Sequence, residues 1–334
     1  MSINRDIVVF SHNLRSCVEI ILLRKRGYFT VGGFLALLAA LGYTVYNILM
    51  RRGLMEENPG SIWDTRLIVS FATMVIFFIG AFIAELLGYG VLQDFKDLSL
   101  MALLFILLSG TFGALIGAFF LTMAVAQIGA SQTSVLSGGT NPIFTTLLGI
   151  VFLGQVPDLI GIIAVLVIVG GIICVGYHGH EGTIALLEKT RLAGGVIALL
   201  AGLSFALAQV AKGEALNLGA TPNTAFVIGQ TIPFVISIII CLKKSGGLAY
   251  LKDISRESLY CYLGASIGIV LGVYCLLAAF TFIPVWQAVA ILGIQPLIAV
   301  FLSWIFLKKA DKVSLRLIYG AVLVTFGVVI LNVY

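Results

Sequence analysis

GGFLALLAALGY at residues 32–43 recurs as GGVIALLAGLSF at residues 194–205, a displacement of 162 residues along the chain. At the same displacement, Asn47 stands opposite Gln209. A repeat with this period indicates that the chain contains two copies of one structural unit. Two further matches follow in the same order: Gly113-x3-Gly117 with Gly268-x3-Gly272, and Gly139-Thr140-Asn141-Pro142 with Gly293-Ile294-Gln295-Pro296.

The composition places both copies in a membrane. The chain has 334 residues, of which 60% are hydrophobic and 10% charged, and its mean hydropathy is +1.12. Soluble domains carry about 25% charged residues. Because so few charges cannot cover a water-exposed surface, the composition excludes soluble enzymes, nucleic-acid-binding proteins and disulfide scaffolds. The net charge of +5 is typical of a chain that contacts anionic lipid headgroups, so no nucleic-acid partner is expected.

Long apolar runs, separated by charges and turn residues, predict about ten transmembrane helices of the length that crosses a bilayer. Only helices and closed barrels satisfy their backbone hydrogen bonds in lipid, and runs of this length favour helices. The predicted fold class is therefore an all-α membrane protein. The expected spans are residues 31–50, 67–88, 100–127, 131–153, 158–177, 192–212, 223–242, 259–282, 286–307 and 314–333.

Each copy of the repeat holds about five of these helices. Because five is an odd number, the second copy enters the membrane from the opposite side, which predicts two inverted five-helix repeats at residues 31–180 and 190–334. An inverted pair has a pseudo-two-fold axis in the membrane plane. Exchanging the conformations of its halves gives an inward-open and an outward-open state, which is alternating access.

Residues 1–30 form a separate N-terminal segment. Ile7, Phe10, Leu14, Val18 and Ile21 recur at spacings of three and four, and a run of three basic residues follows them. This spacing is typical of an amphipathic helix. We therefore expect an N-terminal amphipathic helix lying along the membrane interface, the alternative being a disordered tail.

These features resemble EamA-type members of the drug/metabolite transporter superfamily, over about residues 30–333. The resemblance lies in the five-plus-five arrangement, the GG-x2-ALLA openings, the glycine-containing third and eighth helices, and the Asn-Pro and Gln-Pro pairs. It implies a non-enzymatic transporter that exports or exchanges amino acids, other metabolites, nucleotide sugars, phosphorylated sugars or drugs, without selecting among them. The chain departs from the family in its basic N-terminal extension and in Gly154-Gln155, where an acidic residue often stands.

Polar side chains inside spans are candidate transport residues, because each must be satisfied by protein, water or substrate. Every Asp and Glu of the apolar region falls at or beyond the end of an expected span, so neither a carboxylate proton relay nor an acidic site for an organic cation is predicted, and we expect a facilitator or exchanger. Lys212 could bind a substrate carboxylate or phosphate, or extend to the interface. Aromatic rings could form a cavity wall or belong to interfacial belts. The expected substrate-binding residues are Tyr43, Tyr46, Asn47, Asn141, Gln209, Lys212, Tyr274 and Gln295.

The Asn-Pro and Gln-Pro pairs lie mid-span at repeat-related positions. Proline removes one helical hydrogen bond, and the adjacent amide can satisfy the freed carbonyl or face a ligand. We expect hinges or kinks there, or purely structural kinks, at Gly139, Pro142, Gly293 and Pro296. No cofactor is expected, and no metal site is predicted, because His178 and His180 have no third ligand beside them.

The basic residues give conflicting information on orientation. Those near the N-terminus place it in the cytoplasm, and ten spans would return the C-terminus there, but Lys243, Lys244, Lys308 and Lys309 would then face outward. The resemblance favours two cytoplasmic termini in a multi-pass protein of the cell membrane. Alternatively, Lys308 and Lys309 line a vestibule for anionic substrates. The expected partners are a small-molecule substrate and membrane lipids, with the chain a monomer or a homodimer.

The leading hypothesis is an alternating-access transporter or exporter of a small polar metabolite such as an amino acid. Its cavity is expected between helices one, three and four and their counterparts six, eight and nine. One alternative is an exchanger of phosphorylated or other anionic metabolites, and another is a lipid translocase. A membrane-embedded enzyme is poorly supported, because no cluster of acids, histidines or metal ligands lies at bilayer depth.

Overall fold

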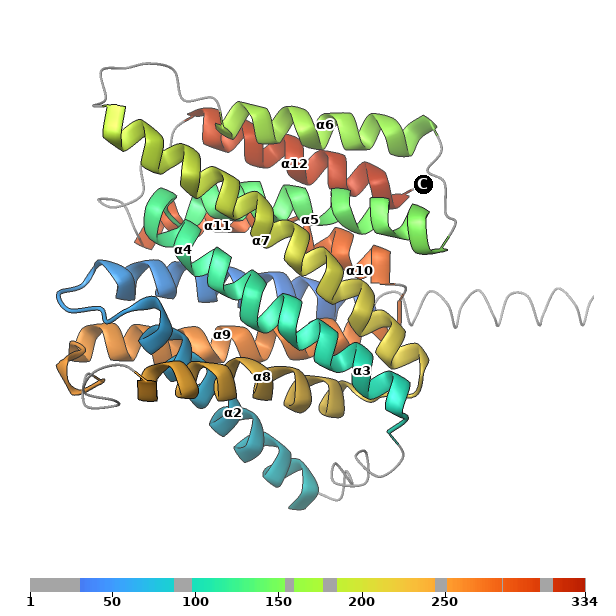
Figure 1. The fold of residues 1–334 in the computed structure, drawn as a ribbon. Helices are drawn as coiled ribbons and strands as arrows, with labels where there is room; N and C mark the ends of the chain where they lie inside the picture. Colours follow the sequence, from blue (N-terminus) through green and yellow to red (C-terminus); the bar gives the residue numbers. More distant parts are fainter. Residues whose placement is uncertain are drawn as a thin grey trace, which may run out of the picture.

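The computed structural model describes residues 31–86, 98–153, 159–176, 185–243, 251–283, 285–306 and 315–333. The expected amphipathic segment at residues 1–30 lies outside this part of the chain. Every element longer than a single turn in the described residues is a helix (Figure 1). The all-helical fold class predicted from the apolar runs is confirmed for these residues.

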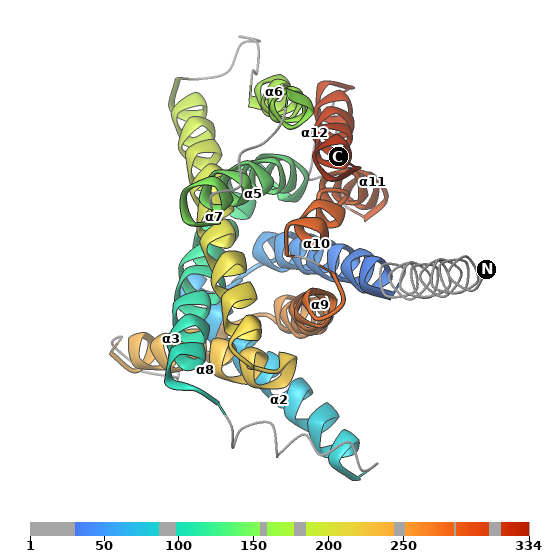
Figure 2. The ribbon, with the colours of Figure 1, turned by 90° about the vertical axis from the view of Figure 1, so that its right-hand side faces the viewer.

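The described helices fall into two groups that follow the repeat. Those of the first half are Val31–Met55, α2 (Ile62–Leu86), α3 (Leu100–Ser109), the π-helical segment η2 (Gly110–Gly117), α4 (Ala118–Ile128), α5 (Ala130–Leu153) and α6 (Leu159–Gly176). Those of the second half are α7 (Ala185–Asn217), α8 (Pro222–Lys243), α9 (Arg256–Phe280), α10 (Val285–Leu292), α11 (Gln295–Phe306) and α12 (Leu315–Val333). In Figure 2, α6 and α12 lie side by side at one edge of the bundle, with α2 and α8 toward the other.

Several of these helices can cross a membrane. Six are long and apolar enough to do so, and the parts Gln295–Phe306 and Leu315–Gly327 are apolar but shorter. The chain is thus a multi-helix membrane protein, whereas the predicted number of ten spans is not confirmed by the described residues. The six are Val31–Met55, Ile62–Ile83, Leu100–Ile128, Leu192–Asn217, Pro222–Lys243 and Arg256–Phe280.

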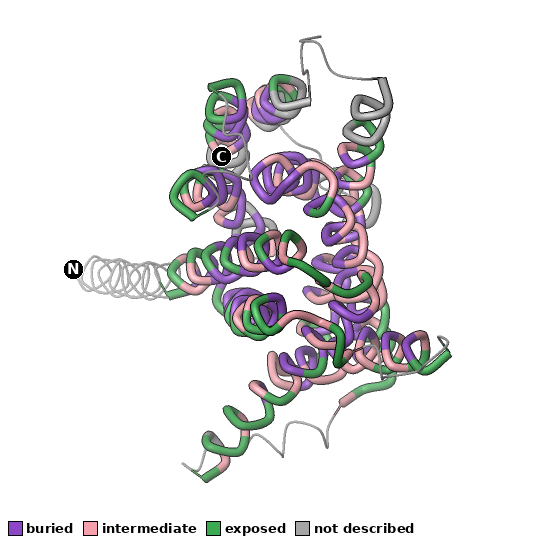
Figure 3. Tube along the Cα trace, turned by 90° about the vertical axis from the view of Figure 1, so that its left-hand side faces the viewer, coloured by how far each residue is buried: buried purple, intermediate pink, exposed green. Residues whose placement is uncertain are grey.

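Burial follows the pattern expected of a bundle in lipid. Figure 3 shows buried residues where the helices face one another and exposed residues on the outer faces. Large apolar side chains remain exposed on the periphery, as at Phe82 and Phe301, while small polar side chains such as Ser266 and Ser303 are fully buried. Helix contacts in membranes use small residues in this way, because lipid tails are apolar and large apolar side chains gain no hydrophobic free energy by leaving the lipid-facing surface.

Capping residues determine where α2 and α8 begin. At the start of α2, the Asp64 N–H donates to Ser61 Oγ at 3.3 Å, and the Ser61 N–H donates to Asp64 Oδ2 at 2.9 Å, which is a reciprocal capping box. Thr221 and Thr224 form the same pair of bonds at the start of α8, at 3.0 and 3.3 Å. Because of its capping box, α2 begins at Ile62 and not at the expected residue 67.

Glycine contacts repeat between the halves. A methyl group added at Gly268 would lie 2.8 Å from the backbone nitrogen of Tyr46, and one at Gly113 would lie 2.8 Å from Ala208 Cβ. Gly113 and Gly268 match in the repeat, and Tyr46 and Ala208 are 162 residues apart. The helix Val31–Met55 therefore packs against α9 as α7 packs against η2, so each half inserts its first helix against the third helix of the other.

The two proline-containing helices differ. The helix predicted at residues 286–307 is interrupted at Gly293 and Ile294, so that α10 ends before Gln295 begins α11. By contrast, α5 continues through Pro142 without interruption. Pro296 lies in the first turn of α11, where proline removes no needed donor, whereas the interior Pro142 does remove one. Leu292 and Gln295, on either side of the α10–α11 break, both line the cavity described next.

Candidate functional site

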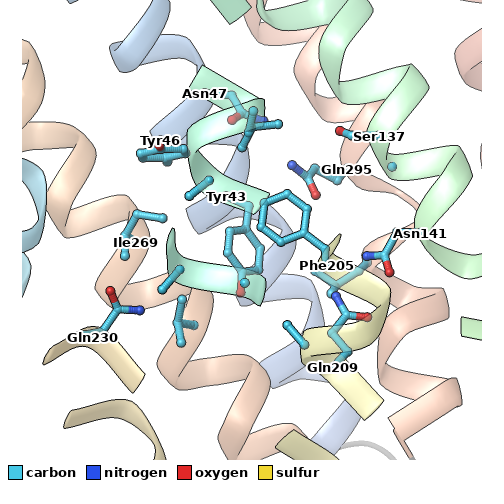
Figure 4. Close-up of a pocket in the computed structure, with 18 of the residues that line it drawn as sticks. Tyr43, Tyr46, Asn47, Ser137, Asn141, Phe205, Gln209, Gln230, Ile269 and Gln295 are labelled. Atoms are coloured by element: carbon cyan, nitrogen blue, oxygen red, sulfur yellow. The ribbon is translucent and has the colours of Figure 1, made fainter. Parts of the chain in front are cut away.

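A cavity lies between the two halves, at the centre of the bundle. Its empty volume is about 880 Å³, including the solvent space at its opening. The lining comes from the helix Val31–Met55, α2, η2, α4 and α5 of the first half and from α7 to α11 of the second. Figure 4 shows Tyr43, Phe205 and Gln209 pointing toward this space.

Most of the lining consists of repeat-related pairs. These pairs take one residue from each half at matching positions of the repeat, which places the cavity on the pseudo-two-fold axis. They are Tyr43 with Phe205, Tyr46 with Ala208, Asn47 with Gln209, Ala114 with Ile269, Ala118 with Val273, Gly138 with Leu292, and Asn141 with Gln295.

The Asn47 and Gln209 amides are buried, with 0% and 5% of their surface exposed. Asn47 Nδ2 donates to Ser134 Oγ at 3.0 Å. Asn47 Oδ1 and Gln209 Oε1 have no hydrogen-bond partner among the described residues. A buried acceptor left without a donor costs about 1–3 kcal/mol. Both oxygens belong to residues that line one cavity, which makes them candidate acceptors for N–H or O–H donors of a ligand.

The second amide pair, Asn141 and Gln295, marks the proline positions. Thr145 Oγ1 donates to Asn141 Oδ1 at 3.2 Å, within α5. On α11, Pro296 is buried, and its Cγ would lie 3.0 Å from a methyl group added at Gly138. Pro142 has no N–H to donate to the Gly138 carbonyl, four residues before it. Pro296 packs against this same Gly138, so the two proline sites meet where α5 crosses α11 at the cavity wall.

Arg66 also lines the cavity, and sequence reasoning missed it. Its side chain is 4% exposed. Nη1 donates to Tyr46 Oη at 3.4 Å and Nη2 donates to the Ala114 carbonyl, while Nε has no partner among the described residues. The apolar run starts after Arg66, so the sequence pattern predicts that Arg66 lies outside the transmembrane span. The spacing of Ser61 and Asp64 is the signal that could have placed it inside the helix.

The π-helical segment explains why the Ala114 carbonyl can accept from Arg66. The Ala118 N–H bonds to the carbonyls of Gly113 and Leu115, five and three residues back, and not to Ala114, four residues back. A π-helical turn thereby leaves a carbonyl without its usual partner, and such turns are frequent at functional sites. Arg66 is thus held by two neutral acceptors, Ala114 and Tyr46.

Lys212 is the second cation of the cavity. Within the part of the chain that the structure describes, its ammonium group makes neither a hydrogen bond nor an ion pair. None of the described lining residues is Asp or Glu. The wall therefore carries two positive charges with no carboxylate beside them. Arg66 is buried and Lys212 is half-buried, and a charge without a counter-ion in such surroundings is costly, which makes an anionic ligand the natural counterpart.

The structure brings together seven of the eight expected substrate-binding residues as lining residues, and Tyr274 is the exception. The Tyr274 hydroxyl donates to Asn223 Oδ1 at 3.0 Å, and its ring contacts those of Phe77 and Phe226. The expected hinge residues Gly139, Pro142, Gly293 and Pro296 lie next to the lining and not in it. Further lining residues outside the expected set include Ser70, Ser137, Phe205 and Gln230. Within the described ranges, no group of three potential metal ligands occurs.

Two inverted groups of membrane helices around a shared polar cavity are the organisation of a secondary transporter. The model of the EamA-like transporter family matches the chain twice, at residues 30–177 and at residues 192–333. The protein therefore belongs to the EamA-like transporter family, within the drug/metabolite transporter superfamily.

Solved structures support the fold, whereas no curated protein matches the chain. One solved structure, described only as a crystal structure of a protein, has 14% sequence identity and a TM-score of 0.54. The match covers 91% of this chain and 97% of the other. At this identity the likeness shows the fold alone and carries no information on the substrate.

Proposed function

We propose that the protein carries a small polar metabolite with an anionic group, a carboxylate or a phosphate, across the membrane by alternating access. An amino acid is the simplest such substrate, and a phosphorylated metabolite is the second. The supporting observation is the pair of cavity cations, Arg66 and Lys212, with no Asp or Glu among the described lining residues.

The charge of the wall argues against an organic cation as substrate. Removing one ion from water costs several kcal/mol even after relaxation, and a counter-ion offsets this cost. A ligand carboxylate or phosphate would supply that counter-ion to Arg66 or to Lys212. A ligand with a net positive charge, such as choline, would add a third uncompensated positive charge to a low-dielectric space and would be repelled, whereas the ammonium group of an amino acid is accompanied by its carboxylate.

The unpartnered amide oxygens favour a substrate that also donates hydrogen bonds. Asn47 Oδ1 and Gln209 Oε1 are acceptors. The amine of an amino acid or the hydroxyl groups of a phosphorylated polyol would satisfy them. A substrate with an anionic group and N–H or O–H groups therefore matches the cations and the acceptors together.

Thermal unfolding of the purified full-length protein in detergent tests the proposal. The ligands are L-serine, glycerol 3-phosphate, choline and a phospholipid. A ligand at a hundredfold excess over its Kd stabilises the folded state by about 2.7 kcal/mol. For a chain of this size, this gain corresponds to a rise in Tm of roughly 4 °C. We expect a rise of this size with L-serine or glycerol 3-phosphate and none with choline.

The variants Arg66→Gln and Lys212→Gln are expected to lose most of that stabilisation. Lys243→Gln is the matched control, because Lys243 is exposed at the end of α8 and does not line the cavity. Stabilisation by choline and not by the anions would refute the proposal. Stabilisation by the phospholipid alone would favour a lipid translocase.

A further inference from the structure

The first helices of the two halves run in opposite directions. Arg51, near the end of Val31–Met55, donates hydrogen bonds of 3.0 and 2.9 Å to two carbonyls in the last turn of α4. A methyl group added at Gly194, near the start of the apolar part of α7, would lie 2.6 Å from Ile128, the last residue of α4. The end of one helix and the start of the other therefore meet at the same end of the bundle.

The opposite ends meet in the same manner. A methyl group added at Gly32 would lie 2.8 Å from Ile283, and one added at Gly213 would lie 2.5 Å from Val285. The start of the first helix and the end of α7 thus both adjoin the connection between α9 and α10 (Figure 1). Lys212, next to Gly213, lies toward this end.

Arg66 lies toward the other end. It is in the second turn of α2, which starts a few residues after Met55 ends the first helix. Tyr262, near the start of α9, donates to the Pro59 carbonyl in this connection at 2.8 Å. Because the helices run across the membrane, Arg66 and Lys212 lie toward opposite membrane faces.

The two cations depart from the repeat that most of the lining residues follow. The capping boxes of α2 and α8 are 160 residues apart, which makes Phe226 the counterpart of Arg66. Phe226 is buried, with its ring stacked on Phe77 at 4.5 Å. The counterpart of Lys212 is Met50, which is 0% exposed. Each end of the cavity therefore has one cation, and each half contributes one.

We propose that Arg66 and Lys212 are two separate anion-binding sites, one serving each membrane face, between which the anionic group of the substrate passes during transport. This inference rests on the proposed function and deepens it, since it assigns the cations to the two access states. When the cavity opens at one face, the cation toward that face is the first fixed charge that the substrate meets.

The contacts of the two cations allow such a transfer. Lys212 makes no bond among the described residues, so an arriving anion displaces nothing. The bonds of Arg66 go to a hydroxyl and a carbonyl, both neutral, and its Nε is unpartnered. A carboxylate or phosphate forms stronger, charge-assisted bonds with a guanidinium than these neutral acceptors do.

The test is an exchange assay in proteoliposomes sorted by the accessibility of a C-terminal tag, so that each population exposes one known face. In a passive carrier, the ratio of Vmax to KM for net flux is the same in both directions, so this ratio cannot distinguish the two faces. The half-saturating concentration at one face is therefore measured in exchange, with the probe saturating on the other side of the membrane. The probes are radiolabelled L-serine and glycerol 3-phosphate. The measured quantity is the half-saturating concentration at each face.

Arg66→Gln is expected to raise the half-saturating concentration at one face by about tenfold or more, the loss for one hydrogen bond to a charged group. At the other face, it should change by less than about threefold. Lys212→Gln is expected to show the reverse, and Lys243→Gln no change at either face. If Arg66→Gln does not fold, Arg66→Lys, which keeps the charge, is measured instead. We expect it to raise the half-saturating concentration by a smaller factor, at the same face only.

Three outcomes contradict the proposal in different ways. Equal increases at both faces for each variant would mean one shared anion site, which overturns the two-site inference and leaves the proposed function standing. Saturable exchange that neither variant impairs would overturn the anion-binding role of both cations. No saturable exchange of either probe by the parent protein would overturn the proposed function itself.

Discussion

Gly268→Ala tests the contact between α9 and the first helix, on which the cavity depends. The added methyl group would lie 2.7 Å from the Gly42 carbonyl oxygen and 2.8 Å from the Tyr46 nitrogen. Both atoms are backbone, so no side-chain rotation relieves the contact. Carbon atoms prefer separations of about 3.5 Å or more, so the helices must move apart by about 0.7 Å.

The expected loss of stability follows from a comparison with Gly80→Ala. A methyl group added at Gly80, inside α2, would meet nothing within 4 Å. Both substitutions gain up to about 1 kcal/mol of helix propensity, so the difference between them isolates the overpacking. Overpacking costs about 1–3 kcal/mol. For a chain of this size, Gly268→Ala should therefore melt roughly 1.5–4 °C below Gly80→Ala.

The assay is thermal unfolding of each variant in detergent, followed with a thiol-reactive dye whose signal rises above that of the accessible Cys174 and Cys261 when the buried Cys241 and Cys275 become exposed. Transport should fall in Gly268→Ala, because the displaced Tyr46 accepts a hydrogen bond from Arg66. Equal melting temperatures for the two variants would show that the helices are not in contact at this position. That result would refute the repeat-related packing of the two halves.

Three further predictions concern single side chains. Gln209→Leu should raise stability by about 1 kcal/mol in thermal unfolding, because it removes a buried oxygen without a partner, while transport falls; lower stability would contradict this. Arg51→Met should lower the free energy of unfolding by about 1–3 kcal/mol through the loss of two hydrogen bonds to α4, with ligand affinity unchanged. A change in ligand affinity without a change in stability would contradict a structural role for Arg51. Ser99→Ala should lower stability by about 1 kcal/mol, because Ser99 Oγ accepts from the Ala102 N–H at the start of α3, and Ser99→Asp is the control expected to keep the cap.

The repeat was the part of the fold that the sequence predicted best. Matching residues such as Asn47 and Gln209 both line the cavity, because a duplicated unit brings equivalent positions to its symmetry axis. Tyr274 lies on α9, which does contribute to the cavity, but its side chain lies outside the lining. Its ring is drawn into the aromatic contacts with Phe77 and Phe226, which a one-dimensional pattern does not show.

The features that sequence reasoning missed depend on local backbone bonding. Arg66 was excluded because the apolar run begins at Leu67, although the capping box starts the helix earlier. The π-helical turns of η2 carry the same apolar and glycine residues as a regular helix would. The matching glycine of the other half, Gly268, lies in α9, which is a regular α-helix, so the glycine pattern alone does not predict the π-helical turns.

The positions of the cations are consistent with an electrostatic limit on the duplicated unit. Had both halves kept both cations, Met50 and Phe226 would also be charged, and four positive charges would share one cavity. Two unit charges about 10 Å apart repel by about 1.7 kcal/mol at an effective dielectric constant of about 20. Raising the number of cations from two to four raises the number of repelling pairs from one to six. One cation at each end keeps a positive charge near either opening, while the uncharged counterparts Met50 and Phe226 are buried in the packed interior.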